Sequence, residues 1–219
     1  MIIEIFVLAL ASSVRPTSLA AVYALVSQDA RRPLMWAYVI AGLAFTLCFG
    51  AIIVGATHGI HPSSGSDETK GIADIAGGVL ALAFGIGIAS GRIRREHMDD
   101  APRAGGRMKE ALERRLTIRT AAIAGPATHI PGLFYLIALN VIVAHEAALA
   151  DATFALVVYN AVWFAVPLAT LVACIFRPAA ARDLVGWVEV WTREHARGIL
   201  LVVSFGAGAG LLLRGILAL

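Results

Sequence analysis

Long apolar segments, separated by shorter polar stretches, dominate the sequence. Each segment has about 20 or more residues, and a helix rising about 1.5 Å per residue then crosses the roughly 30 Å hydrocarbon core of a bilayer. The pattern predicts an all-α integral membrane protein with six transmembrane helices. The expected spans are residues 2–27, 34–58, 71–91, 119–145, 152–176 and 198–218.

Two of these spans carry a proline and polar residues near their centre, within residues 12–17 and 128–132. A proline inside a helix leaves the carbonyl four residues back without its hydrogen bond. We therefore expect the first helix to break at Pro16 and the fourth at Pro131. The second half of each helix would then begin near the bilayer midplane, and a helix N-terminus attracts anions.

The two prolines also suggest that the chain is a repeat. Ser13 and Thr128 each precede a proline by three residues, and Tyr38 of the second span resembles Tyr159 of the fifth. Because each copy has an odd number of spans, the second copy would cross the membrane in the opposite direction, as in many secondary transporters. The expected units are a first three-helix repeat over 1–91, a basic loop over 92–118 and a second three-helix repeat over 119–219.

The basic residues predict the orientation in the membrane. On the alternating sides of six spans, 15 of the 18 Lys and Arg residues fall on one side. By the positive-inside rule this side is cytoplasmic, so we expect a plasma-membrane protein with both termini extracytoplasmic and loop 92–118 cytoplasmic. A surface helix is expected over 107–119, and Trp187 and Trp191 predict an interfacial amphipathic helix over 177–197.

Close helix packing is expected where small residues recur four positions apart, because they let helix backbones approach one another in lipid. The third span has two such pairs and the sixth has one. The pairs are Ala73/Gly77, Ala81/Gly85 and Gly206/Gly210.

The centre of the repeat has the chemistry of an anion site. Arg15 lies about 18 Å from either end of its span, where a charge is costly and marks a functional position. A guanidinium matches the oxygens of a phosphate, sulfate or carboxylate, and nearby side chains offer hydrogen bonds. Asp74 and Asn160 are candidates for ion coupling. The predicted substrate-binding residues are Ser12, Ser13, Arg15, Pro16, Thr17, Thr128, His129, Pro131 and Gly132.

Structural roles are the alternative for each of these residues. The prolines alone would only kink helices, and His129 would be a packed helix residue. Arg15 would pair with a carboxylate, for which Asp74 and Glu4 are the candidates. Polar residues in the spans would hydrogen-bond between helices, namely Asn140, Tyr159 and Asn160.

The remaining composition argues against other classes of function. Hydrophobic residues make up 59% of the chain and charged residues 15%, below the roughly 25% charged residues of a soluble domain. No nucleic-acid partner is expected, because the basic residues lie at the edges of spans. Cys48 and Cys174 lie inside apolar segments and are expected to be buried hydrophobes without a disulfide or a metal. No metal site is expected at the loose pair of His58 and His61, and no cofactor is expected.

The spans, the two broken helices and the basic central loop resemble the lysine-exporter superfamily. Within it, residues 13–16 and 31–33 are most similar to the actinobacterial GAP family, which includes glycopeptidolipid- and sulfolipid-1-addressing proteins. The resemblance implies export or translocation of an anionic cell-envelope glycolipid across the plasma membrane, with no ATPase domain and no enzymatic activity. It also leaves room for a homodimer or for a larger lipid-transport machinery.

Other groups that resemble this layout have different functions. Thiol-disulfide electron carriers place a cysteine three residues before each proline, where this chain has Ser13 and Thr128. Hydroxyls cannot exchange disulfides, so a redox enzyme is not expected. Metal exporters would need clusters of carboxylates or histidines within the spans. An exporter of a small molecule or an amino acid is the alternative function, and it would favour an acidic residue where this chain has Arg15.

Overall fold

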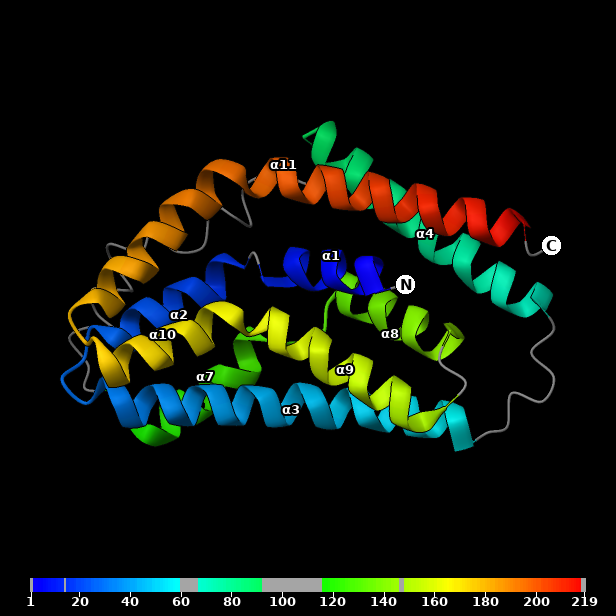
Figure 1. Ribbon diagram of the computed structural model, residues 1–219. Helices are drawn as coiled ribbons and strands as arrows, with labels where there is room; N and C mark the ends of the chain where they lie inside the picture. The colour runs from blue at the N-terminus through cyan, green and yellow to red at the C-terminus, as the bar shows by residue number, and fades with distance from the viewer. Residues whose placement is uncertain (1, 14, 60–66, 92–115, 146–147, 218–219) are drawn as a thin grey trace.

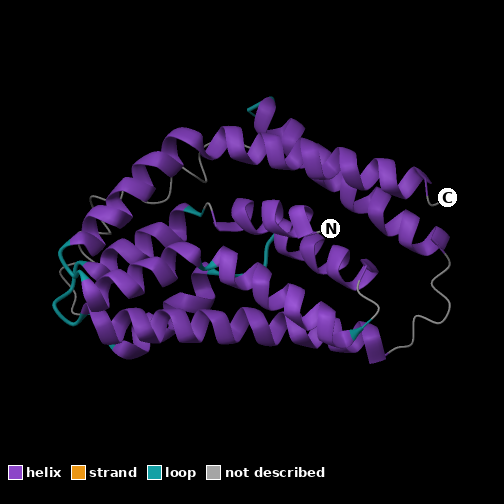
Figure 2. Ribbon diagram, viewed as in Figure 1, coloured by secondary structure: helices purple, strands orange, loops and turns teal. Residues whose placement is uncertain are grey.

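A computed structural model describes residues 2–13, 15–59, 67–91, 116–145 and 148–217. This described part is helical and contains no strand (Figures 1 and 2). The expected surface helix over 107–119 lies largely outside the described residues. The helices are α1 (Ile2–Ser13), α2 (Pro16–Val26), α3 (Arg31–Gly59), α4 (Asp67–Ala89), α7 (Ile118–Thr128), α8 (Leu133–His145), α9 (Leu149–Trp163), α10 (Ala165–Phe176) and α11 (Ala180–Leu217).

Their length and composition fit a membrane protein. Two segments, Arg31–Ala56 of α3 and Arg197–Leu217 of α11, are long and apolar enough to cross a bilayer singly. Three helix pairs do so if each bent pair counts as one span: α1 with α2, α7 with α8, and α9 with α10, bent by 59°, 68° and 63°. The described helices therefore supply between two and five spans. The expected third span is α4, whose apolar part, Asp74–Ala89, is shorter.

The first and fourth expected spans are divided near their prolines. The fifth is divided as well, which the sequence analysis did not predict. α9 ends at Trp163 and α10 begins at Ala165. Pro167 explains this break, because it has no N–H to donate to the carbonyl of Trp163 four residues earlier.

The helix expected over 177–197 is present from Ala180, but it is not divided from the expected sixth span, and its interfacial position stays a prediction. These residues continue into the last span as α11, a single helix of 38 residues. No proline occurs between Ala180 and Leu217, so nothing in the backbone interrupts the helical hydrogen bonds. α11 bends over the other helices and then runs beside α4 (Figure 1).

Glycines bring α4 and α11 into close contact. A Cβ atom added at Gly78 would lie 2.9 Å from the carbonyl oxygen of Gly208, so the two backbones leave no room for a side chain. The expected pair Gly206/Gly210 does not lie in this contact, because a Cβ at either position would meet no atom within 4 Å. The spacing of small residues correctly identified the last helix as a close-packing helix. The face of that helix that contacts α4 is the one that holds Gly208.

The centre of the molecule is an aromatic core. Five large side chains there are at most 1% exposed, and they come from α3, α8, α9 and the α9–α10 junction. α1 packs against α8 and α9 around this core, so the breaks in the first and fourth spans face it. The five residues are Tyr38, Tyr135, Tyr159, Trp163 and Phe164.

Candidate functional site

The breaks of the first and fourth spans meet at Arg15. Arg15 has an extended backbone (φ −124°, ψ 113°) at the start of α2, and its Nη1 donates a hydrogen bond of 2.8 Å to the carbonyl oxygen of Ile130. Ile130 lies in the non-helical link between α7 and α8. Two motifs 115 residues apart are thus in direct contact.

The two prolines occupy different backbone positions at their breaks. Pro16 is the first residue of α2, where no helical hydrogen bond requires its N–H. Pro131 lies in the link after α7 rather than inside a helix, and α7 accommodates a different proline, Pro126, near its end. The N–H of Leu136 donates to the carbonyl of Gly132 at 3.1 Å, so α8 begins directly after the link.

Arg15 lies at the N-terminus of α8. Its Nη2 is 2.7 Å from the position that a Cβ of Gly132 would occupy, so glycine leaves space for the guanidinium. A helix N-terminus carries a partial positive charge of about half an elementary charge. A guanidinium beside it makes the site more positive, and this combination favours an anion.

An aromatic ring supports the guanidinium on another side. The Cζ of Arg15 lies 5.0 Å from the centre of the Trp163 ring, in the range of a cation–π interaction. Among the described side chains, no carboxylate lies within ion-pair distance of Arg15. The charge of Arg15 is therefore solvated by a carbonyl and a ring, and neither of these neutralises it.

Asp74 does not pair with Arg15, contrary to one alternative from the sequence. Its carboxylate binds Arg214 of α11, with distances of 2.7 Å to Nε and 2.5 Å to Nη2. Asn140 of α8 donates a third bond of 3.4 Å. Asp74 is only 4% exposed, so it joins three helices inside the protein.

Two tyrosines link the broken helices to the rest of the core. The hydroxyl of Tyr159 lies 2.6 Å from that of Ser12, and the hydroxyl of Tyr38 lies 2.8 Å from that of Thr128. Each tyrosine thus contacts the break that belongs to the other half of the chain. The buried hydroxyl of Ser18 lies 3.1 Å from that of Tyr38.

His129 is packed among aromatic rings. Its ring stacks on Phe164 with centres 4.0 Å apart, and the residue is 1% exposed. Nδ1 lies 3.0 Å from the carbonyl oxygen of Gly125, and Nε2 lies 3.4 Å from the hydroxyl of Ser18. These contacts hold the ring in place and agree with the packing alternative for His129.

The structure separates the predicted site residues into two groups. Arg15, Ser12, Thr128, His129 and Gly132 come together at the two breaks. The hydroxyl of Ser13 instead bonds to the carbonyl of Leu10, and Thr17 is exposed. Asn160 is buried near Trp163, and its Nδ2 donates to the carbonyl of Leu156.

Ser18 and Trp163 also belong to this cluster, and neither was predicted as a site residue from the sequence. Ser18 follows Thr17 by one residue, and helical rotation alone brings it to the core face. Trp163 lies in no sequence motif, and only its large side chain distinguishes it from its apolar neighbours. Two polar atoms here have no hydrogen-bond partner among the described residues, Nε1 of Trp163 and Oδ1 of Asn160.

The structure corrects one prediction for the cysteines. Both are free, and Cys174 is buried as expected, but Cys48 is exposed on the outward side of α3. The described residues include no group of three or more His, Cys, Asp or Glu side chains that could hold a metal ion.

The fold and the site define a class of protein: a helical membrane protein in which two broken helices meet around a half-buried guanidinium. Residues 5–217 match a family model described as Sap, sulfolipid-1-addressing protein. The chain belongs to this family, which confirms the resemblance to sulfolipid-1-addressing proteins. No curated protein and no solved structure matches the chain.

Proposed function

We propose that the protein exports an anionic cell-envelope glycolipid across the plasma membrane and binds the headgroup at Arg15. The observation that carries the proposal is a half-buried guanidinium at a helix N-terminus, with no carboxylate within ion-pair distance among the described side chains. A charge in this setting needs a counter-charge, and a lipid phosphate, sulfate or carboxylate would supply it. The family description, which names sulfolipid-1, favours the same class of substrate.

The transport mechanism that we propose depends on an inverted repeat of two three-helix units, residues 1–91 and 119–219. Two observations support the repeat. Arg15 contacts Ile130 at the same spacing of 115 residues that separates Pro16 from Pro131. The tyrosines also exchange contacts, since Tyr38 reaches the second break and Tyr159 reaches the first. Rocking of one unit against the other would expose Arg15 alternately to each side of the membrane.

We further propose that loop 92–118 is cytoplasmic and that both termini are extracytoplasmic. The excess of Lys and Arg on one side supports this orientation. In this orientation the lipid would be collected from the cytoplasmic leaflet and released on the outer side.

Export of a small molecule or an amino acid is the second candidate function. It is supported by the resemblance to the lysine-exporter superfamily. It would require a buried carboxylate to recognise the amino group of the substrate. Asp74 is a buried carboxylate of this kind, but it is already bound to Arg214. This pairing makes an amino-acid substrate the weaker proposal.

Replacement of Arg15 tests the proposed function. Cells lacking the protein would be complemented with the wild type, Arg15→Gln or Arg15→Lys, and anionic lipids extractable from the cell surface would be quantified by mass spectrometry. Arg15→Gln should abolish export, and Arg15→Lys should restore only part of it because Lys lacks the bidentate fork. Arg177→Gln, at an exposed arginine after α10, is the matched control and should export normally. Wild-type export by Arg15→Gln at equal protein abundance would contradict the proposal.

A further inference from the structure

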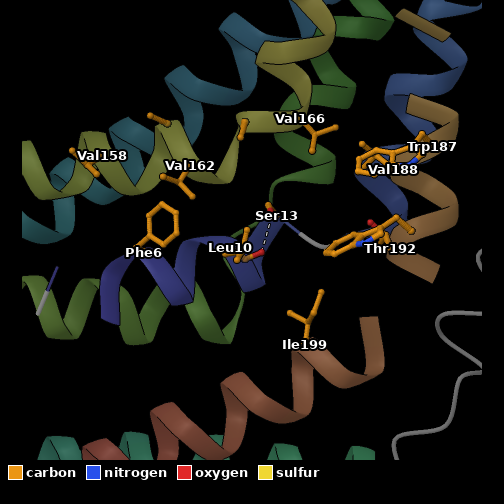
Figure 3. A pocket seen from close by; sticks show the side chains of 13 residues that line it. Phe6, Leu10, Ser13, Val158, Val162, Val166, Trp187, Val188, Thr192 and Ile199 are labelled. Atoms are coloured by element: carbon orange, nitrogen blue, oxygen red, sulfur yellow. Dashed lines mark hydrogen bonds between the residues drawn. The ribbon is translucent and has the colours of Figure 1, made fainter. Parts of the chain in front are cut away.

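A cavity of about 600 Å³ lies between α1, α9, α10 and α11. Side chains of α1, α9 and α10 form one wall, and α11 closes it from the other side (Figure 3). Ser13 lines this cavity, whereas its neighbour Ser12 contacts Tyr159 in the core. The break in the first span therefore separates an apolar cavity from the polar site.

The chemistry of the lining selects a hydrocarbon ligand. Of the described side chains that line the cavity, none is charged, and only Ser13 and Thr192 carry a hydroxyl. The hydroxyl of Ser13 already bonds to the carbonyl of Leu10. A sugar or an amino acid bound here would lose water and find few hydrogen-bond partners to replace it, at a cost of about 1–3 kcal/mol for each unpaired group. The volume is in the range of sites that hold small molecules, roughly 300–1,000 Å³.

The mouth of the cavity faces the surroundings of the helices. Phe6, Leu10 and Trp187 line it and are 51%, 47% and 64% exposed. For helices that cross a bilayer, the surrounding medium is lipid. Trp187 and Trp191 mark one end of the cavity as interfacial, since tryptophan side chains favour the headgroup level of a membrane.

We propose that this cavity binds one acyl chain of an anionic membrane lipid, which enters from the leaflet near Trp187 and Trp191. The chain lies along α1 between α9 and α11, and its headgroup approaches the break beside Ser13, two residues before Arg15. That the bound lipid is also the transported lipid rests on the proposed function. Binding of an acyl chain in the cavity is a separate property and has its own measurement.

The test uses the full chain in nanodiscs of phosphatidylcholine that contain a trace of phosphatidylglycerol with a diazirine in one acyl chain. After illumination, labelled peptides are mapped by mass spectrometry. Labelling should concentrate on the peptides that contain Leu10, Val162 and Trp187. The exposed residues Ile52 and Phe176, which lie outside the cavity, provide the background from ordinary surrounding lipid. A phosphatidylcholine probe with the same diazirine should label the cavity less, because it has no net negative charge.

Occlusion variants provide the decisive comparison. Ala165→Phe and Ala161→Phe place a ring in the cavity and should lower cavity labelling about tenfold. Ala51→Phe, at an exposed alanine of α3 outside the cavity, is the matched control and should leave the labelling unchanged.

A second measurement leaves the residues that line the cavity unchanged. In a Trp36→Phe background, an anionic lipid with a brominated acyl chain should quench tryptophan fluorescence at lower concentration than the phosphatidylcholine analogue.

The outcomes separate this inference from the proposed function. Labelling spread equally over all exposed helix faces, or unchanged in both occlusion variants, would overturn the acyl-chain site even if export still required Arg15. Cross-linking of a second protein copy at the cavity, in place of lipid labelling there, would identify an oligomer interface. That outcome would also overturn the acyl-chain site. Specific labelling in a protein whose export does not depend on Arg15 would support the cavity and contradict the proposed function.

Discussion

Arg15 donates its hydrogen bond to Ile130, the residue that occupies the corresponding position in the second proline motif. The pair is separated by 115 residues, which is also the spacing of Pro16 and Pro131. Equivalent residues of two copies meet only close to an axis that relates the copies. The contact thus supports the proposed inverted repeat, and it puts the guanidinium near the centre of that repeat.

The two tyrosine contacts give a first prediction. Tyr159→Phe should lower the free energy of unfolding by about 0.5–1.5 kcal/mol, because it removes the interhelical hydrogen bond to Ser12. Tyr38→Phe should lower it by at least as much, because it removes the hydrogen bonds to Thr128 and Ser18. The midpoint of thermal unfolding in detergent measures the effect. Tyr23→Phe, on α2 outside this network, is the control and should have an unchanged midpoint. Equal midpoints for all three variants would show that the hydroxyl contacts do not stabilise the fold.

The ion pair between Asp74 and Arg214 gives a second prediction. Asp74→Asn should lower the free energy of unfolding by about 1–3 kcal/mol, because it replaces the buried carboxylate that binds the Arg214 guanidinium with a neutral amide. The double variant Asp74→Arg with Arg214→Asp should recover part of the loss, as it restores opposite charges. Both are measured by thermal unfolding in the same detergent. A double variant less stable than either single variant would argue against a simple pairing.

Packing of α4 against α11 gives a third prediction. Gly78→Ala should destabilise the protein by about 1–3 kcal/mol, because the new Cβ meets the backbone of Gly208. Gly206→Ala is the matched control, since a Cβ there meets nothing within 4 Å. It should be neutral or slightly stabilising because alanine favours helix by about 1 kcal/mol over glycine. Equal stability of the two variants would place the helix contact elsewhere.

The cysteines give a fourth prediction. A variant with Cys48→Ala and Cys174→Ala should export lipid at a rate within about twofold of the wild type, because neither thiol lies at the two breaks and small apolar side chains can replace them. The assay is the surface-lipid measurement used for Arg15. Loss of export accompanied by a change in cellular thiol oxidation would point to redox chemistry and would overturn the transporter proposal.

The orientation in the membrane gives a fifth prediction. In the background without native cysteines, a single cysteine introduced within loop 92–118 should not react with an impermeant maleimide added to intact cells. The same cysteine should react fully once the cells are opened. Reaction before opening would reverse the proposed orientation.

The sequence by itself determined the helical character, the long apolar segments that form membrane helices and the two breaks that meet at Arg15. Hydrophobic length and proline chemistry act locally, so they can be read without knowing what a segment packs against. For the same reason the two motifs could be recognised as a pair before their contact was known.

Only the tertiary structure decided which way the polar side chains face. Spans that are apolar on every side carry little periodic signal, so nothing local showed that Ser12 and Ser18 face the core while Ser13 faces the cavity and Thr17 is exposed. The choice of partner for Asp74 is also non-local, because Arg214 lies 140 residues away. Rotation of each helix about its axis is set by packing against neighbours, and so the apolar cavity between α1, α9, α10 and α11 exists only in the folded chain.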